Sequence, residues 1–106
     1  MIRIEIGFDE RGRIVDLAVV GHSGTAERGK DIVCAGVSAI VQTALLGVLQ
    51  QLKHPCEYEV DSGVLRLVLK DSPTDSTEAV LQTMLLGLGE IAKQNPQAVK
   101  IHRKSR

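Results

Sequence analysis

Residues 32–52, IVCAGVSAIVQTALLGVLQQL, form a long uncharged stretch that decides the predicted fold. Its length is sufficient for a membrane span. However, Ser38, Gln42 and Thr43 interrupt it, and the chain has one tyrosine and no tryptophan for an interfacial belt. We therefore predict a helix that is buried in protein on most of its faces, and we expect no membrane partner.

One side of this helix carries small residues, and a proline follows its end. Small side chains recur at four-residue spacing, which lets another backbone approach closely. These residues are Ala35, Ala39, Thr43 and Gly47. Pro55 cannot continue a helical hydrogen-bond ladder, so the helix is predicted to end before it.

Strands are predicted on both sides of the first helix. Residues 1–6, MIRIEI, alternate apolar and charged side chains, and a turn at residues 9–12 leads into a second apolar run over residues 13–21. After the helix, residues 57–69, EYEVDSGVLRLVL, read as two strands joined by a turn at Asp61 and Gly63. Each region predicts a β-hairpin.

A second helix and a last strand complete the pattern. The helix follows Pro73, with Asp75 or Ser76 as its N-cap and Glu78 in its first turn. A turn at residues 95–96 then precedes a short strand. The order β-β-α-β-β-α-β predicts an α+β fold over residues 1–106, a single domain with a five-stranded, mostly antiparallel or mixed sheet and two helices.

The second helix is apolar around more than one face. A small sheet cannot bury two such helices completely, which predicts a homodimer, although the two helices could instead bury one another. The formal net charge is zero, which makes nucleic acid an unlikely partner. The basic residues 100–106, KIHRKSR, are interpreted as a solvated tail. Two cysteines and no leader-like start predict reduced thiols in the cytoplasm.

His22 and Cys34 are the candidate reactive pair. A cysteine attacks as its thiolate, which a helix N-terminus and a nearby cationic histidine both stabilise. Asp31 can cap the first helix, which places Cys34 in the first turn, and His22 is separated from Cys34 by a loop. Gly24 and Gly29 lie in that loop, which we predict to be mobile.

The residues alone leave a structural alternative open. A first-turn cysteine also packs well as a small apolar side chain, and a histidine at a strand end is as easily a hydrogen-bonded end residue. Ser38, one helical turn after Cys34, could support a site or bond back to a helix carbonyl. Asp31 could cap the helix or orient His22.

The other cysteine is a poorer candidate nucleophile. Cys56 follows Pro55 at a strand start, without a helix dipole and next to the carboxylate of Glu57, which disfavours a thiolate. The histidines and cysteines show no paired metal-ligand spacing, so no metal and no other cofactor is expected.

A set of these residues resembles the bacterial ribosomal-processing cysteine protease family, Prp. The set is Gly21 and His22, then G-x-D-x-x-C from Gly29 to Cys34, then Ser38. The resemblance implies a homodimeric cysteine endopeptidase in which His22 is the base and Cys34 the nucleophile, with Asp31 and Ser38 in support. It further implies that the substrate is the precursor of ribosomal protein L-twenty-seven, whose N-terminal extension is cut after aromatic residues.

Two alternatives come from other classes of protein. A non-enzymatic ribosome-associated module would touch RNA with its basic C-terminal residues, and its binding would weaken steeply with salt. A thiol redox protein would pair Cys34 with Cys56, which requires their Cα atoms to lie within about 7 Å of each other.

Overall fold

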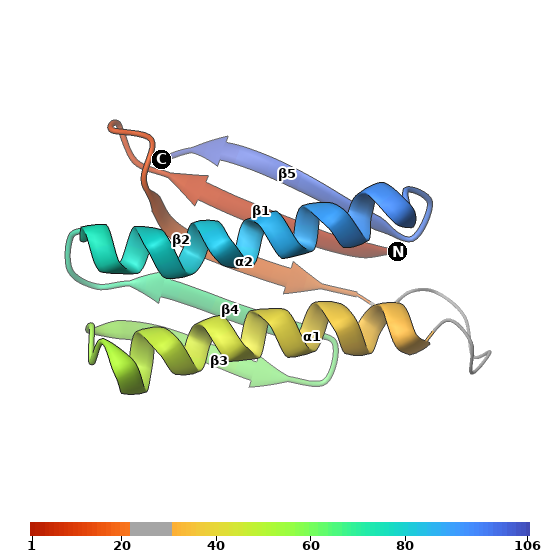
Figure 1. Cartoon of the computed structure of the whole chain (residues 1–106), viewed down its shortest axis with the longest axis horizontal. Coiled ribbons are helices and arrows are strands. Elements are labelled where there is room, and N and C mark those ends of the chain that lie inside the picture. The colour runs from red at the N-terminus through yellow and green to blue at the C-terminus, as the bar shows by residue number, and fades with distance from the viewer. Residues whose placement is uncertain (22–30) are drawn as a thin grey trace.

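Two helical segments lie side by side on one face of a five-stranded sheet (Figure 1). This computed structural model describes residues 1–21 and 31–106. The elements are β1 (Ile2–Phe8), β2 (Ile14–Val20), α1 (Asp31–Leu46), η2 (Gly47–Gln51), β3 (Cys56–Asp61), β4 (Val64–Leu69), α2 (Asp75–Gln94) and β5 (Val99–Ser105). The order confirms the predicted α+β arrangement, with η2 a wider helical turn that continues α1.

The strand order in the sheet is β3-β4-β2-β1-β5, which the sequence had left open. The strands of each hairpin pair in antiparallel fashion, and β2 also pairs antiparallel with β4. The last strand, β5, pairs parallel with β1, so the sheet is mixed. As a result, β3 and β5 are the two edges.

The core lies between the sheet and the helices. The alternation seen in the first residues places Ile2, Ile4 and Ile6 on the buried face of β1, where none is more than 2% exposed. Val37 and Val41 of α1 pack onto this layer. Burial of each such side chain contributes about 1.5–3 kcal/mol to the free energy of unfolding.

The first helix is much less buried than its composition suggested. Residues 32–51 are long and apolar enough to cross a membrane by length and composition, yet only 28% of the most apolar window is buried. Ile32 is 73% exposed and Leu46 is 52% exposed. The prediction that most faces of this helix are buried is therefore wrong, because one sheet and one neighbouring helix cover only part of its circumference.

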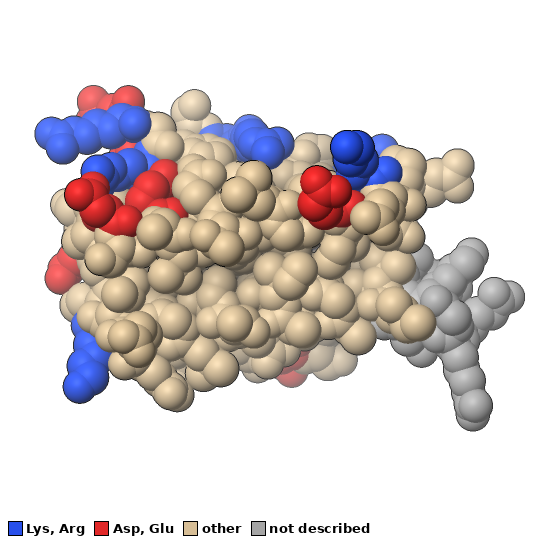
Figure 2. Space-filling view, viewed as in Figure 1, with Lys and Arg blue, Asp and Glu red and all other residues tan. Residues whose placement is uncertain are grey.

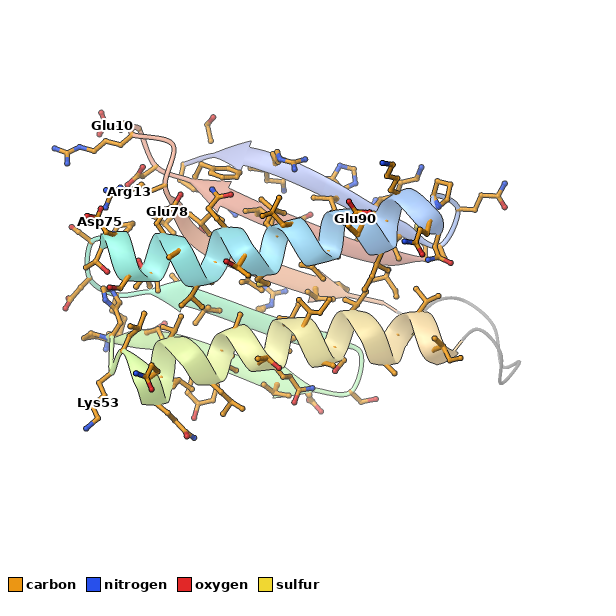
Figure 3. All side chains as sticks on the ribbon, in the orientation of Figure 1. Glu10, Arg13, Lys53, Asp75, Glu78 and Glu90 are labelled. Carbon is orange, nitrogen blue, oxygen red and sulfur yellow. The ribbon has the colours of Figure 1, made fainter. Side chains whose placement is uncertain are left out.

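The second helix starts one or two residues earlier than predicted. Its N-cap is Thr74, not Asp75 or Ser76: Thr77 N–H donates to the Thr74 hydroxyl at 3.1 Å, and Thr74 N–H donates to Thr77 Oγ1 at 2.9 Å. Asp75 instead pairs with Arg13, and Glu78 accepts a hydrogen bond from Ile14 N–H at 2.9 Å (Figure 3). These contacts fix the start of α2 to β2.

The interpretation of the basic C-terminal residues as a solvated tail is wrong. They form β5, because Val99 is buried and the strand pairs with β1 along its length. Lys104 lies 3.2 Å from a carboxylate oxygen of Glu5, and its hydrogen bond lowers the pKa of that carboxyl. Arg106 Nε lies 2.9 Å from Asp16 Oδ2 in a second ion pair.

Candidate active site

Cys34 lies in the first turn of α1, as predicted. The helix begins at Asp31, and the N–H groups of a first turn have no partner within their own helix. The side chain is partly buried and packs against the core. Cys34 therefore combines a position at the positive end of a helix with access from outside.

A pocket of about 210 Å³, here called the Cys34 pocket, opens beside this cysteine. Its apolar lining includes Ile2, Val37, Val41 and Leu65, all of which are buried core residues. Its polar lining residues are Ser38, Gln42 and Asp61. An apolar lining with a few polar groups is typical of a ligand-binding pocket.

The β3–β4 hairpin forms the far wall of the pocket. Its turn and the start of α1 lie at the same end of the molecule (Figure 1). Val60, Gly63 and Val64 contribute to the lining. The sequence carried no signal for these residues, because their position depends on β4 pairing with β2 rather than on any local motif.

Gly21 ties the end of β2 to this hairpin. Its φ of 98° lies in the left-handed region that favours glycine, and its N–H donates to Gly63 O at 2.9 Å. A Cβ at this position would lie 2.4 Å from the carbonyl oxygen of Met1. Only glycine fits here, and the backbone immediately before His22 is held at the pocket.

Ser38 lies on the pocket side of α1, one turn after Cys34. Its hydroxyl accepts a hydrogen bond from Gln42 Nε2 at 2.6 Å. The Thr43 hydroxyl, in contrast, donates to the carbonyl oxygen of Ala39, one turn back in the helix, at 2.7 Å. The two hydroxyls on this helix thus have different surroundings and different partners.

The partner proposed for Cys34 lies outside the described residues. His22, Gly24 and Gly29 all fall within residues 22–30, and the side chain of Asp31 is likewise not described. The contact between His22 and Cys34, the mobility of the loop and the supporting role of Asp31 therefore stay predictions.

Cys56 lies at the opposite end of α1 and η2. The helical path between the cysteines, at 1.5 Å per residue, separates them by roughly 25 Å, far beyond disulfide range. Neither forms a disulfide within the described chain, which removes the basis of the redox alternative. Burial raises the pKa of the Cys56 thiol, and Glu57 is not the cause, since neighbouring strand residues point to opposite faces.

A larger hollow of about 700 Å³, here called the interhelical groove, runs between α1 and α2. Its lining is small, apolar or hydroxyl-bearing and includes Ala39, Thr43, Gly47, Ala79, Thr83 and Gly87. The small residues at 39, 43 and 47 thus lie along this groove. It contains no cysteine, histidine or carboxylate.

Within residues 1–21 and 31–106, no three histidine, cysteine, aspartate or glutamate side chains cluster as metal ligands would.

Comparison with known proteins identifies the family. Residues 1–100 match the family described as cysteine protease Prp. The chain belongs to the cysteine protease Prp family. A curated Staphylococcus aureus member, the ribosomal processing cysteine protease Prp of strain Mu50, is 29% identical over 98% of this chain and 100% of its own length.

Solved structures of Prp proteins share the fold. The S. aureus Prp with a covalently linked product peptide matches with a TM-score of 0.89 and 27% identity, over 98% of this chain and all of that one. The same protease with a substrate peptide matches equally well, at 26% identity. A Streptococcus mutans protein at 21% identity, with a TM-score of 0.83 over all of this chain and 96% of its own, shows the fold alone.

Membership in the Prp family makes this chain a cysteine protease. That activity excludes a purely non-enzymatic module. A cysteine protease needs a cysteine beside a space for its substrate. Cys34 lines such a pocket, whereas Cys56 lies at the far end of the helix, so Cys34 is the stronger candidate nucleophile.

Proposed function

We propose that this protease removes the N-terminal extension of the precursor of ribosomal protein L-twenty-seven. The names of its S. aureus relatives, which describe a ribosomal processing protease, support this substrate. The observation that carries the proposal is the placement of Cys34 in a helix first turn beside an apolar pocket large enough for a side chain.

Cys34 is the proposed nucleophile, and His22 the proposed base and acid. The Cys34 sulfur bonds to the scissile carbonyl carbon, and backbone N–H groups of the helix first turn are proposed to stabilise the developing oxyanion. His22 then protonates the leaving amine, and water hydrolyses the thioester. Gly21 supports this role for His22, because Gly21 directly precedes it, lines the pocket and packs closely against the Met1 carbonyl.

Asp31 and Ser38 are proposed to support this geometry, and residues 23–30 to act as a lid with Gly24 and Gly29 as hinges. The pocket is proposed to hold the aromatic side chain before the cleaved bond. Its wall is aliphatic, with neither Phe8 nor Tyr58 in the lining. An aliphatic wall binds a ring through burial of apolar surface.

The test is cleavage of a synthetic peptide that spans the extension and the first residues of the mature ribosomal protein. We expect one cut at the end of the extension, loss of that cut in Cys34→Ala and in His22→Ala, and normal cutting by Cys56→Ala. Mass spectrometry of the products identifies the bond. An intact peptide after prolonged incubation with the unmodified enzyme would remove the proposed substrate.

We also propose that the enzyme is a homodimer joined through the exposed faces of α1 and α2. Residues 32–52 contain no charge, and Leu86 of α2 is 72% exposed. Figure 2 shows a broad surface without Lys, Arg, Asp or Glu over these helices, and the labelled Glu90 in Figure 3 lies toward one end of α2. Two helices about 30 Å long and about 10 Å apart present roughly 600 Å², close to the area one partner buries in a stable complex.

Light scattering coupled to gel filtration tests the dimer. The unmodified protein is expected to have the mass of two chains, and Leu86→Glu that of one, because a carboxylate would be buried at the interface. Val68→Glu is the matched control: Val68 is 46% exposed on the opposite face of the sheet and should leave the dimer intact. A single-chain mass for the unmodified protein at about 0.1 mM would contradict the proposal.

A cytoplasmic location is proposed as well, because a ribosomal substrate and a chain with only two cysteines fit a reducing compartment. Nucleic acid is not a proposed partner. Two cations of the basic C-terminal residues, Lys104 and Arg106, already pair with Glu5 and Asp16. Such ion pairs lower the positive potential that phosphate recognition requires.

A further inference from the structure

The edge strand β3 carries backbone groups that face away from the sheet. β3 pairs with β4 on one side, and no other strand of residues 1–21 and 31–106 pairs with its second side. A strand edge of this kind offers N–H and C=O groups to any extended chain that approaches it.

The register identifies which groups these are. Lys70 N–H donates to Pro55 O at 2.9 Å, so Pro55 and Lys70 form a hydrogen-bonded pair. In an antiparallel ladder, hydrogen-bonded pairs alternate with non-bonded pairs. Glu57, Glu59 and Asp61 are therefore bonded to β4. The N–H and C=O groups of the residues between them, Tyr58 and Val60, point to the free edge.

This edge leads directly into the Cys34 pocket. Val60 and Asp61, at the end of β3, line that pocket together with Cys34. The side chains of Tyr58 and Val60 are 56% and 51% exposed on the same side of the sheet as the helices, since they pair with the buried Leu67 and Leu65. A chain added along β3 would have apolar contacts and would reach the thiol.

The negative charges on β3 disfavour pairing of its free edge with the β3 edge of a second copy of the protein. The side chains of Glu57, Glu59 and Asp61 share the other face of the strand, and within residues 1–21 and 31–106 the only cation paired with them is Arg66, 3.7 Å from Glu59. Two β3 edges paired with each other would bring six carboxylates together, which is destabilising. A peptide without opposing carboxylates meets no such repulsion.

We propose that the substrate docks as an added strand on the free edge of β3, with hydrogen bonds to the backbone of Tyr58 and Val60. This mode of recognition, strand addition to a sheet edge, is sequence-tolerant along the backbone and places alternate side chains on opposite faces. It would set the register that presents one peptide bond to Cys34. The inference rests on the proposed proteolysis and names how the substrate is held.

N-methylation of the substrate tests the docking mode without altering the enzyme. The probe is the precursor peptide described above, prepared as a series in which one amide at a time is N-methylated, with the bond to be cut left unmodified. A strand bonded to β3 turns every second N–H toward it. We expect kcat/KM to fall about tenfold at alternate positions and to change little at those between.

The matching change in the enzyme is Val60→Pro, with Val60→Ala as control. Proline removes the edge N–H, is tolerated on edge strands and breaks no bond to β4, while alanine removes the side chain and keeps the N–H. We expect Val60→Pro to lose about five- to tenfold more kcat/KM than Val60→Ala, mainly through KM. Circular dichroism melting checks that both variants fold.

The outcomes separate this inference from the proposed function. Equal losses at successive methylated positions, together with equal activity of Val60→Pro and Val60→Ala, would show that β3 does not hold the substrate and that its charges serve only to protect the edge, while the proteolysis itself would stand. If the unmodified peptide were not cut at all, both the proposed substrate and this docking mode would be wrong.

Discussion

The two hollows beside α1 differ in size and in chemistry. The interhelical groove has a volume of about 700 Å³ and the Cys34 pocket about 210 Å³. Of the two, only the smaller hollow is lined by a cysteine and a serine of α1, together with residues of the β3–β4 hairpin. We therefore assign the larger hollow to the proposed dimer surface, and the smaller one, beside the start of α1, to the proposed active site.

Among changes that keep every reactive group, Gly21→Ala is expected to have the largest effect on the Cys34 pocket. The added Cβ would meet the Met1 carbonyl oxygen at 2.4 Å at a φ that alanine avoids, so the backbone before His22 must move. We expect kcat/KM for the precursor peptide to fall about 100-fold, as a displacement of about 1 Å near a site can produce.

Gly89→Ala is the control for this change. Gly89 is in α2, where an added Cβ has no neighbour within 4 Å, so alanine should preserve activity and raise the free energy of unfolding by up to about 1 kcal/mol. Equal activity of Gly21→Ala and Gly89→Ala would show that Gly21 does not position the site.

A smaller effect is expected from the two hydroxyls on opposite sides of α1. Ser38→Ala removes the acceptor of the Gln42 hydrogen bond in the Cys34 pocket, which should lower kcat/KM about two- to tenfold. Thr43→Ala removes a hydroxyl from the interhelical groove and should change kcat/KM by less than about twofold. Thermal melting of both variants separates activity from stability. Wild-type turnover in Ser38→Ala would return Ser38 to a packing role.

The smallest effect is expected at Cys56. Because burial raises the pKa of this thiol, less thiolate is present at neutral pH, and the fraction rises as the pH increases. We expect slow alkylation of Cys56 by iodoacetamide at pH 7 and faster alkylation at pH 9, measured by peptide mapping in a Cys34→Ala background. Rapid alkylation at pH 7 with little pH dependence would contradict this account.

The elements could be predicted from the sequence because each is encoded locally. Ile2, Ile4 and Ile6 alternate as strand residues on a half-buried sheet do, and the uncharged stretch has the length of a helix. Cys34 could be placed in the first turn for the same reason. The cap of α2 was misassigned because Thr74, Asp75 and Ser76 are all good capping residues, and only the reciprocal bonds with Thr77 choose among them.

The pocket could not be predicted, because it depends on contacts between distant segments. Val60 and Ile2 meet Cys34 only after β2 pairs with both β1 and β4, and strand order is not written in local periodicity. The exposure of α1 was missed for a related reason: composition shows that Ile32 and Leu46 are apolar, not how much of the helix one sheet covers.

The central claim is that Cys34 performs the peptide cleavage. The most direct measurement compares unmodified enzyme, Cys34→Ala and Cys56→Ala in single-turnover reactions with the precursor peptide, using intact-protein mass spectrometry to detect a peptide joined to the enzyme by a thioester. The account predicts an acyl adduct on Cys34 in the unmodified enzyme and in Cys56→Ala, with neither adduct nor product in Cys34→Ala. Cleavage of the same bond by Cys34→Ala would contradict it.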